Sequence, residues 1–403
     1  MAPRPARPLR VAPAPGVLAA VIALAGCGQI NFAERQQPDG PGPGGLTVGG
    51  ARLTNVNSRT VLTASGGVPP YRFGLIAGQG RLDAATGELL TPAFAQALEV
   101  EVRDAAGASG RATVDVGGTY LYYVAGRDAS DTTHDQVWRS EDGGATWQLH
   151  GTLPGTSYNG GLVVLDDAMV WMAGRPGGWR DEVWRSTDGV TWDLIGRLPS
   201  TRASFYPAVF AGALWVAGGY SDGVTRDQVW RSDDGGATWS GVGTLPLTIH
   251  GGPLVPHAGR LWYLGGLDEG GTGYRDDVWW STDGASWTEV ADVLPGACAY
   301  TSVHVDADGL MLAGGSDSPC GKDVFRSADA VAWRTWGTLE GAHSNGRLLR
   351  HRGELLYVAG GANLDGQPAS DLVLVSPDGV AFVERGRLPA PRYGGGLVAF
   401  TPR

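Results

Sequence analysis

The side chains best suited to chemistry in this chain are Tyr, His and Arg residues that occupy corresponding places in an internal repeat. Each comes shortly before a short segment of small and apolar residues. We expect those segments to be equivalent strands around a common axis, so that the polar side chains gather at one mouth of a channel. Such a ring could hold a polar or anionic ligand, and a solvated rim without a ligand is the alternative. The ring consists of Tyr158, Arg202, His250, Tyr300, His343, Arg392 and Tyr393.

Motifs that commit a chain to a reaction are missing from this sequence. H-E-x-x-H does not occur, and the G-x-S-x-G match at residues 219 to 223 lies in a variable loop of the repeat rather than between a strand and a helix, so the sequence offers no metalloprotease helix and no nucleophile elbow. His and Cys residues do not stand at metal-ligand spacing, and we therefore expect no metal and no other cofactor. We predict no catalytic residue.

The ring residues are positioned by a repeat that occurs six times, as in "DQVWRSDDGGATWSGVGTLP" at 227 to 246. Successive copies of its Asp are 46, 46, 49, 46 and 49 residues apart. A period of this length, with turn residues between alternating apolar segments, predicts four short strands per copy and hence a β-propeller blade. The aligned Asp residues are Asp142, Asp188, Asp234, Asp283, Asp329 and Asp378.

Glycine doublets end the second predicted strand of most copies, as in "LWVAGG" at 214 to 219. A four-strand unit with this doublet and a later Trp resembles the kelch motif, which implies a propeller. In the first two copies Gly126 and Gly174 are followed by Arg, so these copies depart from the kelch pattern.

A second motif, S-x-D-x-G-x-T-W, is complete at 140 to 147 and 232 to 239 and one residue shorter elsewhere. It resembles the Asp box of sialidase-type propellers. We expect the Asp to cap backbone N–H groups, the Gly to take positive φ, and the indole to wedge between neighbouring sheets. The alternative for the aromatic residues is a stacked carbohydrate platform. Those residues are Trp147, Trp192, Trp239, Trp287, Trp333 and Phe382.

The first and last segments of the repeat region indicate how the ring of sheets closes. The region begins at "TYLYYVAGR", which corresponds to a second strand, and it finishes at "PRYGGGLVAF", which corresponds to a first strand. We predict that the final strand completes the first sheet. The expected fold is all-β, a six-bladed propeller of four-stranded antiparallel blades over residues 118–403, closed by the C-terminal strand.

Residues 47–117 have a different character from the repeats. The alternating segments "ALEVEVRD" and "RATVDV", joined by "AAGASG", predict a hairpin. The opening "GGVPPY" and the later "VRDAAG" resemble bacterial immunoglobulin-like repeats, which implies a small β-sandwich that acts as a spacer or adhesive unit. Residues 27–46 are rich in Pro and Gly and predict a tether.

The N-terminal 26 residues predict a secretion signal, because the apolar stretch is too short to cross a membrane as a helix. "Leu24-Ala25-Gly26-Cys27" resembles the lipobox of bacterial lipoproteins, which implies that Cys27 carries a lipid and becomes the N-terminus. The expected location is the cell envelope, anchored to the outer membrane or cell surface. An ordinary signal peptide with an incidental Cys is the alternative.

With Cys27 carrying the lipid, Cys298 and Cys320 remain as a pair in an oxidising compartment. We predict a disulfide between them, and two buried thiols are the alternative. Copper-radical oxidases also carry a kelch-like propeller and need a Cys beside a Tyr, which Cys298 and Tyr300 supply only superficially. That comparison fails if Cys298 is bonded to Cys320.

The composition and net charge limit the classes of partner that this protein could bind. The 65 Gly and 15 Trp residues suit many tight turns with repeated aromatic packing. A net charge of -10 without a basic cluster argues against nucleic acid. We expect a monomeric, noncatalytic envelope lipoprotein whose propeller binds a protein or a glycan. The alternative is a secreted carbohydrate-active enzyme, either a sialidase-like hydrolase or a copper-radical oxidase.

Overall fold

The structure is a computed structural model. It describes residues 45–50, 52–175, 177–268, 273–316, 320–340, 343–361 and 368–402. The predicted signal peptide, Cys27 and nearly all of the tether lie outside the described residues. The described residues contain strands and no helix, so none of them forms a helix able to cross a membrane. All of the described residues belong to one compact unit.

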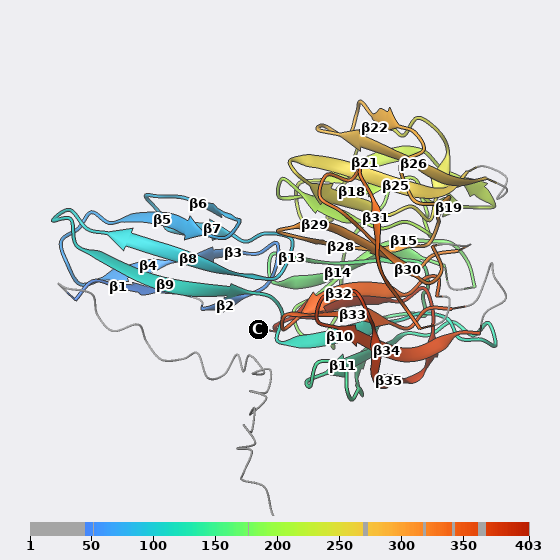
Figure 1. The fold of residues 1–403 in the computed structure, drawn as a ribbon, viewed down its shortest axis with the longest axis horizontal. Coiled ribbons are helices and arrows are strands. Elements are labelled where there is room, and N and C mark those ends of the chain that lie inside the picture. The colour runs from blue at the N-terminus through green and yellow to red at the C-terminus, as the bar shows by residue number, and fades with distance from the viewer. Residues whose placement is uncertain are drawn as a thin grey trace, which may run out of the picture. The chain divides into compact units, whose positions relative to one another are not determined.

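Within the described residues after 118, which we call the repeat region, six sheets of four or five strands follow one another (Figure 1). The first three comprise β10 (Tyr120–Val124), β11 (Gln136–Ser140), β12 (Gln148–Thr152) and β36 (Gly396–Phe400); β13 (Gly161–Leu165), β14 (Ala168–Gly174), β15 (Arg180–Ser186) and β16 (Asp193–Arg197); and β17 (Ala208–Phe210), β18 (Ala213–Ala217), β21 (Gln228–Ser232) and β22 (Ser240–Thr244). A hairpin of β19 (Tyr220–Ser221) and β20 (Val224–Thr225) follows β18.

The remaining three sheets keep the same order. They comprise β23 (Ile249–His250), β24 (Leu254–His257), β25 (Arg260–Asp268), β26 (Tyr274–Ser281) and β27 (Thr288–Val290); β28 (Ser302–Asp306), β29 (Gly309–Ala313), β30 (Asp323–Ser327) and β31 (Arg334–Thr338); and β32 (Arg347–His351), β33 (Glu354–Val358), β34 (Ser370–Ser376) and β35 (Val383–Arg392). Consecutive antiparallel sheets of this kind, in an all-β chain, fit a β-propeller.

The last strand of the chain pairs with the first strand of the repeat region. β36 runs antiparallel to β10, with Tyr120 opposite Phe400 and Val124 opposite Gly396. All five residues of β36 are buried, and Phe400 is fully so. The residues that begin and end the repeat region therefore share one sheet.

The third strands of the sheets carry a common irregularity. In β11 and β21 the register shifts between a buried Val and the Trp that follows it, at Val137/Trp138 and Val229/Trp230. The same shift follows a Val in β15, β30 and β34, but β26, the third strand of the fourth sheet, pairs with β27 without it. A bulge adds local twist to a strand, so this position gives five of the six sheets a similar twist.

The Asp turns link the third and fourth strands, as the turn around Asp234 illustrates. Its carboxylate accepts hydrogen bonds from the backbone N–H of Thr238 at 2.9 Å and from its hydroxyl at 2.6 Å. These bonds lower the pKa of Asp234 to about 2. The indole of Trp239 donates to the carbonyl of Gly236 at 3.1 Å. The equivalent turns around the other five Asp residues are held by similar bonds to their own backbone.

The aromatic residue of each Asp turn packs on a neighbouring sheet. Trp192 belongs to a buried cluster with Tyr122 and Val137 of the first sheet. Trp147, from the first sheet, packs with Leu356 and Val373 of the last one. The aromatic side chains thus join one sheet to another, in addition to filling the core.

Residues 45–117, which we call the small β region, form three sheets. They contain β1 (Thr47–Gly49) with β4 (Thr63–Ser65); β2 (Leu53–Thr54), β9 (Ser109–Val116), β8 (Gln96–Arg103) and β5 (Arg72–Ala77); and β3 (Arg59–Val61), β7 (Glu88–Leu90) and β6 (Arg81–Leu82). β8 and β9 form the predicted antiparallel hairpin. Their inward side chains, including Leu98, Val100 and Val114, build a separate core.

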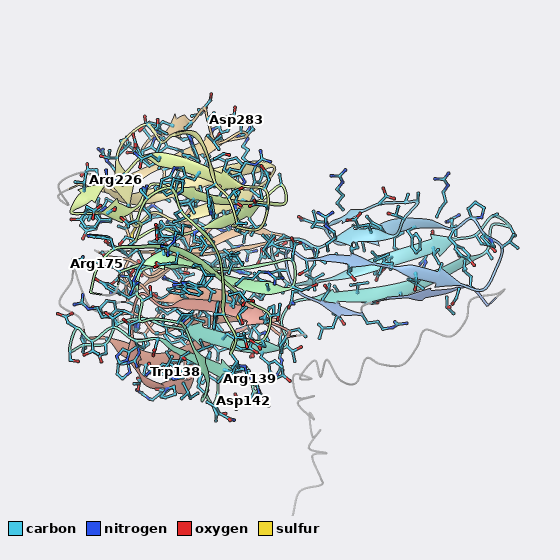
Figure 2. All side chains as sticks on the ribbon, turned by 180° about the vertical axis from the view of Figure 1, so that it is seen from behind. Trp138, Arg139, Asp142, Arg175, Arg226 and Asp283 are labelled. Carbon is cyan, nitrogen blue, oxygen red and sulfur yellow. A yellow bond between two sulfur atoms is a disulfide. The ribbon has the colours of Figure 1, made fainter. Side chains whose placement is uncertain are left out.

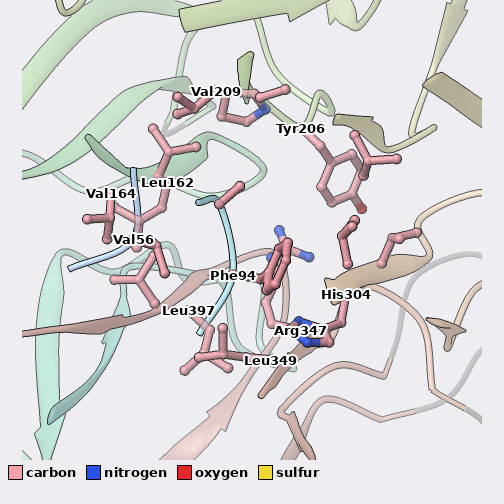
Figure 3. Close-up of a pocket in the computed structure, with 18 of the residues that line it drawn as sticks. Val56, Phe94, Leu162, Val164, Tyr206, Val209, His304, Arg347, Leu349 and Leu397 are labelled. Carbon is pink, nitrogen blue, oxygen red and sulfur yellow. The ribbon is translucent and has the colours of Figure 1, made fainter. Parts of the chain in front are cut away.

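Asn55 connects the small β region to the repeat region. Its side chain accepts from the backbone N–H of Thr401 at 2.8 Å and donates to the Thr401 carbonyl at 3.1 Å. Nearby, an apolar cavity of about 250 Å³ is lined by Val56, Phe94 and the first strands of the sheets (Figure 3). Arg347 and His304 are among the polar side chains that Figure 3 labels there.

Candidate functional site

A larger cavity, of about 720 Å³, lies where loops after the second strands meet the residues that precede the first strands. We call it the rim cavity. Figure 2 shows Arg175, which lines it, and Arg226 along one edge of the repeat region, whereas Asp142 and Asp283 of the Asp turns lie elsewhere on its periphery. Its volume is in the range of ordinary ligand pockets.

Six main-chain hydrogen bonds connect residues beside this cavity. Each bond joins residues that precede the first strands of two successive sheets. We call them the hydrogen-bond belt. The donor and acceptor pairs run Ser204 to Asn159 (2.8 Å), Gly251 to Ser204 (2.8 Å), Tyr300 to Gly251 (2.7 Å), Asn345 to Tyr300 (3.0 Å), Gly394 to Asn345 (3.3 Å) and Asn159 to Gly394 (2.7 Å). The series returns to the residue from which it began.

All six residues of the belt have left-handed backbone conformations. Asn159, Ser204, Tyr300 and Asn345 have φ values between 53° and 56°, and the other two members are glycines. This region costs a residue with a Cβ roughly 1 kcal/mol or more. The four non-glycine members also line the rim cavity.

Aromatic rings form a continuous run along the cavity. Trp179 and Tyr220 meet edge to face with centroids 5.4 Å apart, Tyr220 and His250 are 5.0 Å apart, and His250 and Tyr300 are 5.9 Å apart. The guanidinium of Arg175 lies 4.7 Å from the Trp179 ring centroid. The run offers extended apolar ring faces next to a cation.

Arg127 organises the polar side of the rim cavity. It donates a hydrogen bond to the Tyr158 hydroxyl at 3.1 Å and forms an ion pair with Asp131 at 3.2 Å. Asp131 also accepts a 3.4 Å bond from the hydroxyl of Tyr393. Asp131 is the only carboxylate among the described residues that line the cavity, and its side chain is 70% exposed.

His250 is a titratable group of the cavity wall whose pKa is shifted by burial. Burial lowers its pKa to about 4, and the charge of Asp268 only partly opposes this shift. The imidazole is therefore neutral near pH 7. Its Nδ1 is buried and has no hydrogen-bond partner among the described residues, which leaves one polar atom of the wall unsatisfied.

The structure brings only part of the predicted ring together. Tyr158, His250 and Tyr300 line the rim cavity. Tyr393 contacts it indirectly, through Asp131, and His343 bonds to the carbonyl of Glu340 at 2.8 Å.

Arg202 and Arg392 do not line the rim cavity, and this corrects their assignment to the ligand-binding ring. Arg202 is fully buried, lies 4.1 Å from the ring centroid of Trp230, and donates to Gln228 at 3.1 Å. Arg392 repeats this arrangement on Trp138 and Gln136. Each guanidinium is held by a "QVW" segment, and for Arg392, at the end of β35, that segment belongs to the first sheet. The two side chains therefore stabilise sheets.

The cavity arginines were missed in the sequence, although a signal for them was present. Arg127 and Arg175 follow Gly126 and Gly174, the two positions where the glycine doublet is broken. A departure from the repeat at equivalent positions in adjacent copies marks residues that the fold itself does not require. Trp179 and Tyr220 come from the variable loops after the second strands.

Cys298 and Cys320 are joined by a disulfide, with their Cα atoms 5.9 Å apart. A Cys in a disulfide cannot form the thioether cross-link to Tyr that a copper-radical site needs. The residues present therefore do not fit that cofactor.

One group of carboxylates among the described residues is close enough to hold a cation, namely Asp276, Asp277 and Asp292. The backbone N–H of Asp292 already donates to Asp277 at 3.2 Å. The group does not line the rim cavity.

Comparisons with known proteins agree with the fold and bear on the function. No family model matches the chain. A xyloglucanase from Paenibacillus sp. is 29% identical over 154 residues, which are 31% of this chain and 15% of that protein. The solved structure of YjhT superimposes with a TM-score of 0.50 at 15% identity, covering 60% of this chain and 87% of YjhT. The second similarity shows the fold, a β-propeller.

These comparisons overturn one expectation from the sequence. The noncatalytic interaction platform was wrong as the main interpretation, because the xyloglucanase relative favours the alternative, a secreted carbohydrate-active enzyme. The expectation of a noncatalytic protein had depended on the absence of familiar catalytic motifs. Such motifs identify particular enzyme families, whereas a propeller site is assembled from loops of several repeats.

Proposed function

We propose that this protein is a secreted carbohydrate-active hydrolase that takes its saccharide in the rim cavity. The observation that carries the proposal is the run from Trp179 to Tyr300 beside Arg127 and Asp131. Flat aromatic rings pack against the C–H faces of sugar rings, and charged or amide groups beside them bind hydroxyls. The partial xyloglucanase similarity supports the same substrate class.

Tyr158 and Asp131 are the proposed reacting groups. Most glycoside hydrolases use two carboxylates, but the described lining of the cavity holds one. A tyrosine nucleophile is the known exception, and the Arg127 guanidinium would stabilise the phenolate of Tyr158. Asp131, which starts as the ion-paired carboxylate, would take the phenol proton as Tyr158 attacks and pass it to the departing glycosidic oxygen. Water then cleaves the glycosyl–tyrosine bond and restores Tyr158, so that one water is consumed per bond broken.

The proposed scaffold is a closed ring of six blades. The pairing of β36 with β10, the cyclic order of the hydrogen-bond belt, and the packing of Trp147 on the last sheet all support it. The kelch and Asp-box resemblances add to this support. The immunoglobulin-like character of the small β region is a proposal too, consistent with its two larger sheets and separate core.

Attachment to the envelope through Cys27 also remains a proposal. Replacement by Cys27→Ser should release the protein from membranes into the soluble fraction. Continued association that only detergent disrupts would contradict the lipid anchor.

Turnover measurements test the proposed function. Purified protein should release reducing sugar from xyloglucan oligosaccharides, cello-oligosaccharides or sialosides. Tyr158→Phe and Asp131→Asn should each lower kcat by roughly 100-fold or more with a smaller change in KM. Trp179→Ala should mainly raise KM. Absence of hydrolysis across the panel would refute the hydrolase, and full activity of Tyr158→Phe would refute the nucleophile.

A further inference from the structure

Four residues of the hydrogen-bond belt have backbone conformations that are unfavourable for a residue with a side chain, although glycine at the other two positions avoids that cost. Gly251 and Gly394 occupy two of its six positions, where a left-handed φ carries no steric penalty. The other four positions keep side chains at φ near 55°. Backbone strain that persists beside a cavity is a reason to ask what the side chains there do.

Asn159 and Asn345 tolerate this conformation better than most residues, so the backbone alone does not point to a ligand. Their side chains do. Both line the rim cavity. The amide oxygen of Asn159 is buried without a hydrogen-bond partner among the described residues, and its nitrogen makes only a long 3.4 Å contact with the Ser204 hydroxyl.

Asn345 is two members away from Asn159 in the series, with Gly394 between them. It is 3% exposed, and its side-chain amide makes no hydrogen bond with any described residue, although its backbone carbonyl accepts one from Arg347. A buried polar atom without a partner, such as the amide oxygen of Asn159, is costly. Two amides in the lining of one cavity, with few or no hydrogen bonds inside the protein, are suited to a ligand that supplies both donors and acceptors.

We propose that the amides of Asn159 and Asn345 bind the hydroxyl groups of a terminal sugar unit, which enters the rim cavity end-on with its hydroxyls toward the hydrogen-bond belt. This rests on the proposed function and names the part of the saccharide that is recognised. An amide offers two N–H donors and one acceptor, which matches neighbouring hydroxyls on one ring. Four of the six belt residues line this cavity of about 720 Å³, a volume that suits one end of a saccharide rather than the interior of a long polysaccharide.

Replacement by glycine separates recognition from folding. Asn159→Gly and Asn345→Gly keep a backbone that two other belt positions already use, and they delete only the amide. We expect each variant to bind xyloglucan oligosaccharide or sialyllactose, whichever the wild type binds, at least tenfold more weakly by calorimetry. The melting temperature should stay within about 2 °C of wild type, because relief of strain offsets the added freedom of the unfolded chain.

Ala211→Gly is the matched control. Ala211 has a φ of 53° in an exposed turn and does not line the rim cavity. It should leave affinity unchanged. As a ligand control, the permethylated oligosaccharide cannot donate hydrogen bonds, so wild type and the two Asn variants should bind it equally.

The outcomes are distinguishable. Wild-type binding that is unaffected in both Asn variants overturns this inference and leaves the proposed function standing. Weaker binding accompanied by a lower melting temperature assigns the amides a structural role and also overturns it. If the conservative Asn345→Asp variant, which retains an acceptor and a tolerance of this backbone, binds like wild type, the donor role of that amide is wrong. Failure of the wild type to bind any saccharide overturns both proposals.

Discussion

The Asp turns and the rim cavity are built from the same repeat, yet they differ in how far hydrogen bonds within the protein satisfy their polar groups. In the turns, each carboxylate is satisfied by hydrogen bonds from its own four- or five-residue segment, as at Asp234. In the rim cavity, the amide oxygen of Asn159 and Nδ1 of His250 are buried without a hydrogen-bond partner among the described residues. Internal satisfaction stabilises the fold, whereas unsatisfied groups beside a cavity are available to a ligand.

The test with the largest expected effect replaces one Trp in each region by Ala and compares the results. Trp147→Ala should destabilise the protein by about 3–5 kcal/mol, because it leaves a void between the first and last sheets. Trp179→Ala should change stability by less than about 0.5 kcal/mol and weaken saccharide binding instead. Urea unfolding and calorimetric titration measure the two effects. Equal destabilisation by both variants would remove the distinction.

A second test compares arginines that the sequence alone does not distinguish. Arg202→Ala should cost roughly 2–3 kcal/mol, since it strips Trp230 of its stacked cation and leaves buried acceptors unpaired. Arg175→Ala should leave the free energy of unfolding nearly unchanged, because the side chain is exposed. Denaturant midpoints at equal m-values provide the measurement. A stable Arg202→Ala variant would contradict its structural role.

Acid should weaken the protein through His250. Its folded-state pKa, about 4, is below the unfolded value of 6.5, so the unfolded chain binds more protons between these values and stability falls as pH decreases through that window. The loss from this group should approach about 2 kcal/mol at pH 5. His250→Gln should flatten the pH dependence of the melting temperature between pH 7 and 4. An unchanged slope would show that the imidazole is not buried in solution.

The smallest expected effect concerns a single turn. Asp234→Ala should cost about 1 kcal/mol, because it removes three hydrogen bonds at an exposed position. Asp233→Ala, which removes only a surface ion pair with Arg231, should cost less. The lowered pKa of Asp234 means that its contribution is complete above its ordinary value of 3.8 and disappears as the pH falls toward 2. Thermal melts of the two variants at pH 7 and pH 3 test this.

Local chemistry explains which parts of the fold could be predicted. The "VW" strands, the Gly-rich turns and the hairpin of the small β region depend on residues close in sequence, and the structure has all of them. The residues of the candidate site were predicted less well than these elements of the fold. Tyr158, His250 and Tyr300 line the rim cavity, but Arg202 and Arg392 instead pack on the indole rings of Trp230 and Trp138.

The sequence by itself determined the all-β repeat, its period and the positions of its turns, because Asp, Gly and Trp act within a few residues of their own place in the chain. Only the tertiary structure decided which of the conspicuous polar side chains meet. That outcome depends on the left-handed belt and on stacking between segments more than 20 residues apart, such as Arg202 on Trp230. A guanidinium has the same sequence signature whether it binds a ligand or covers an indole, and only its neighbours in space distinguish the two.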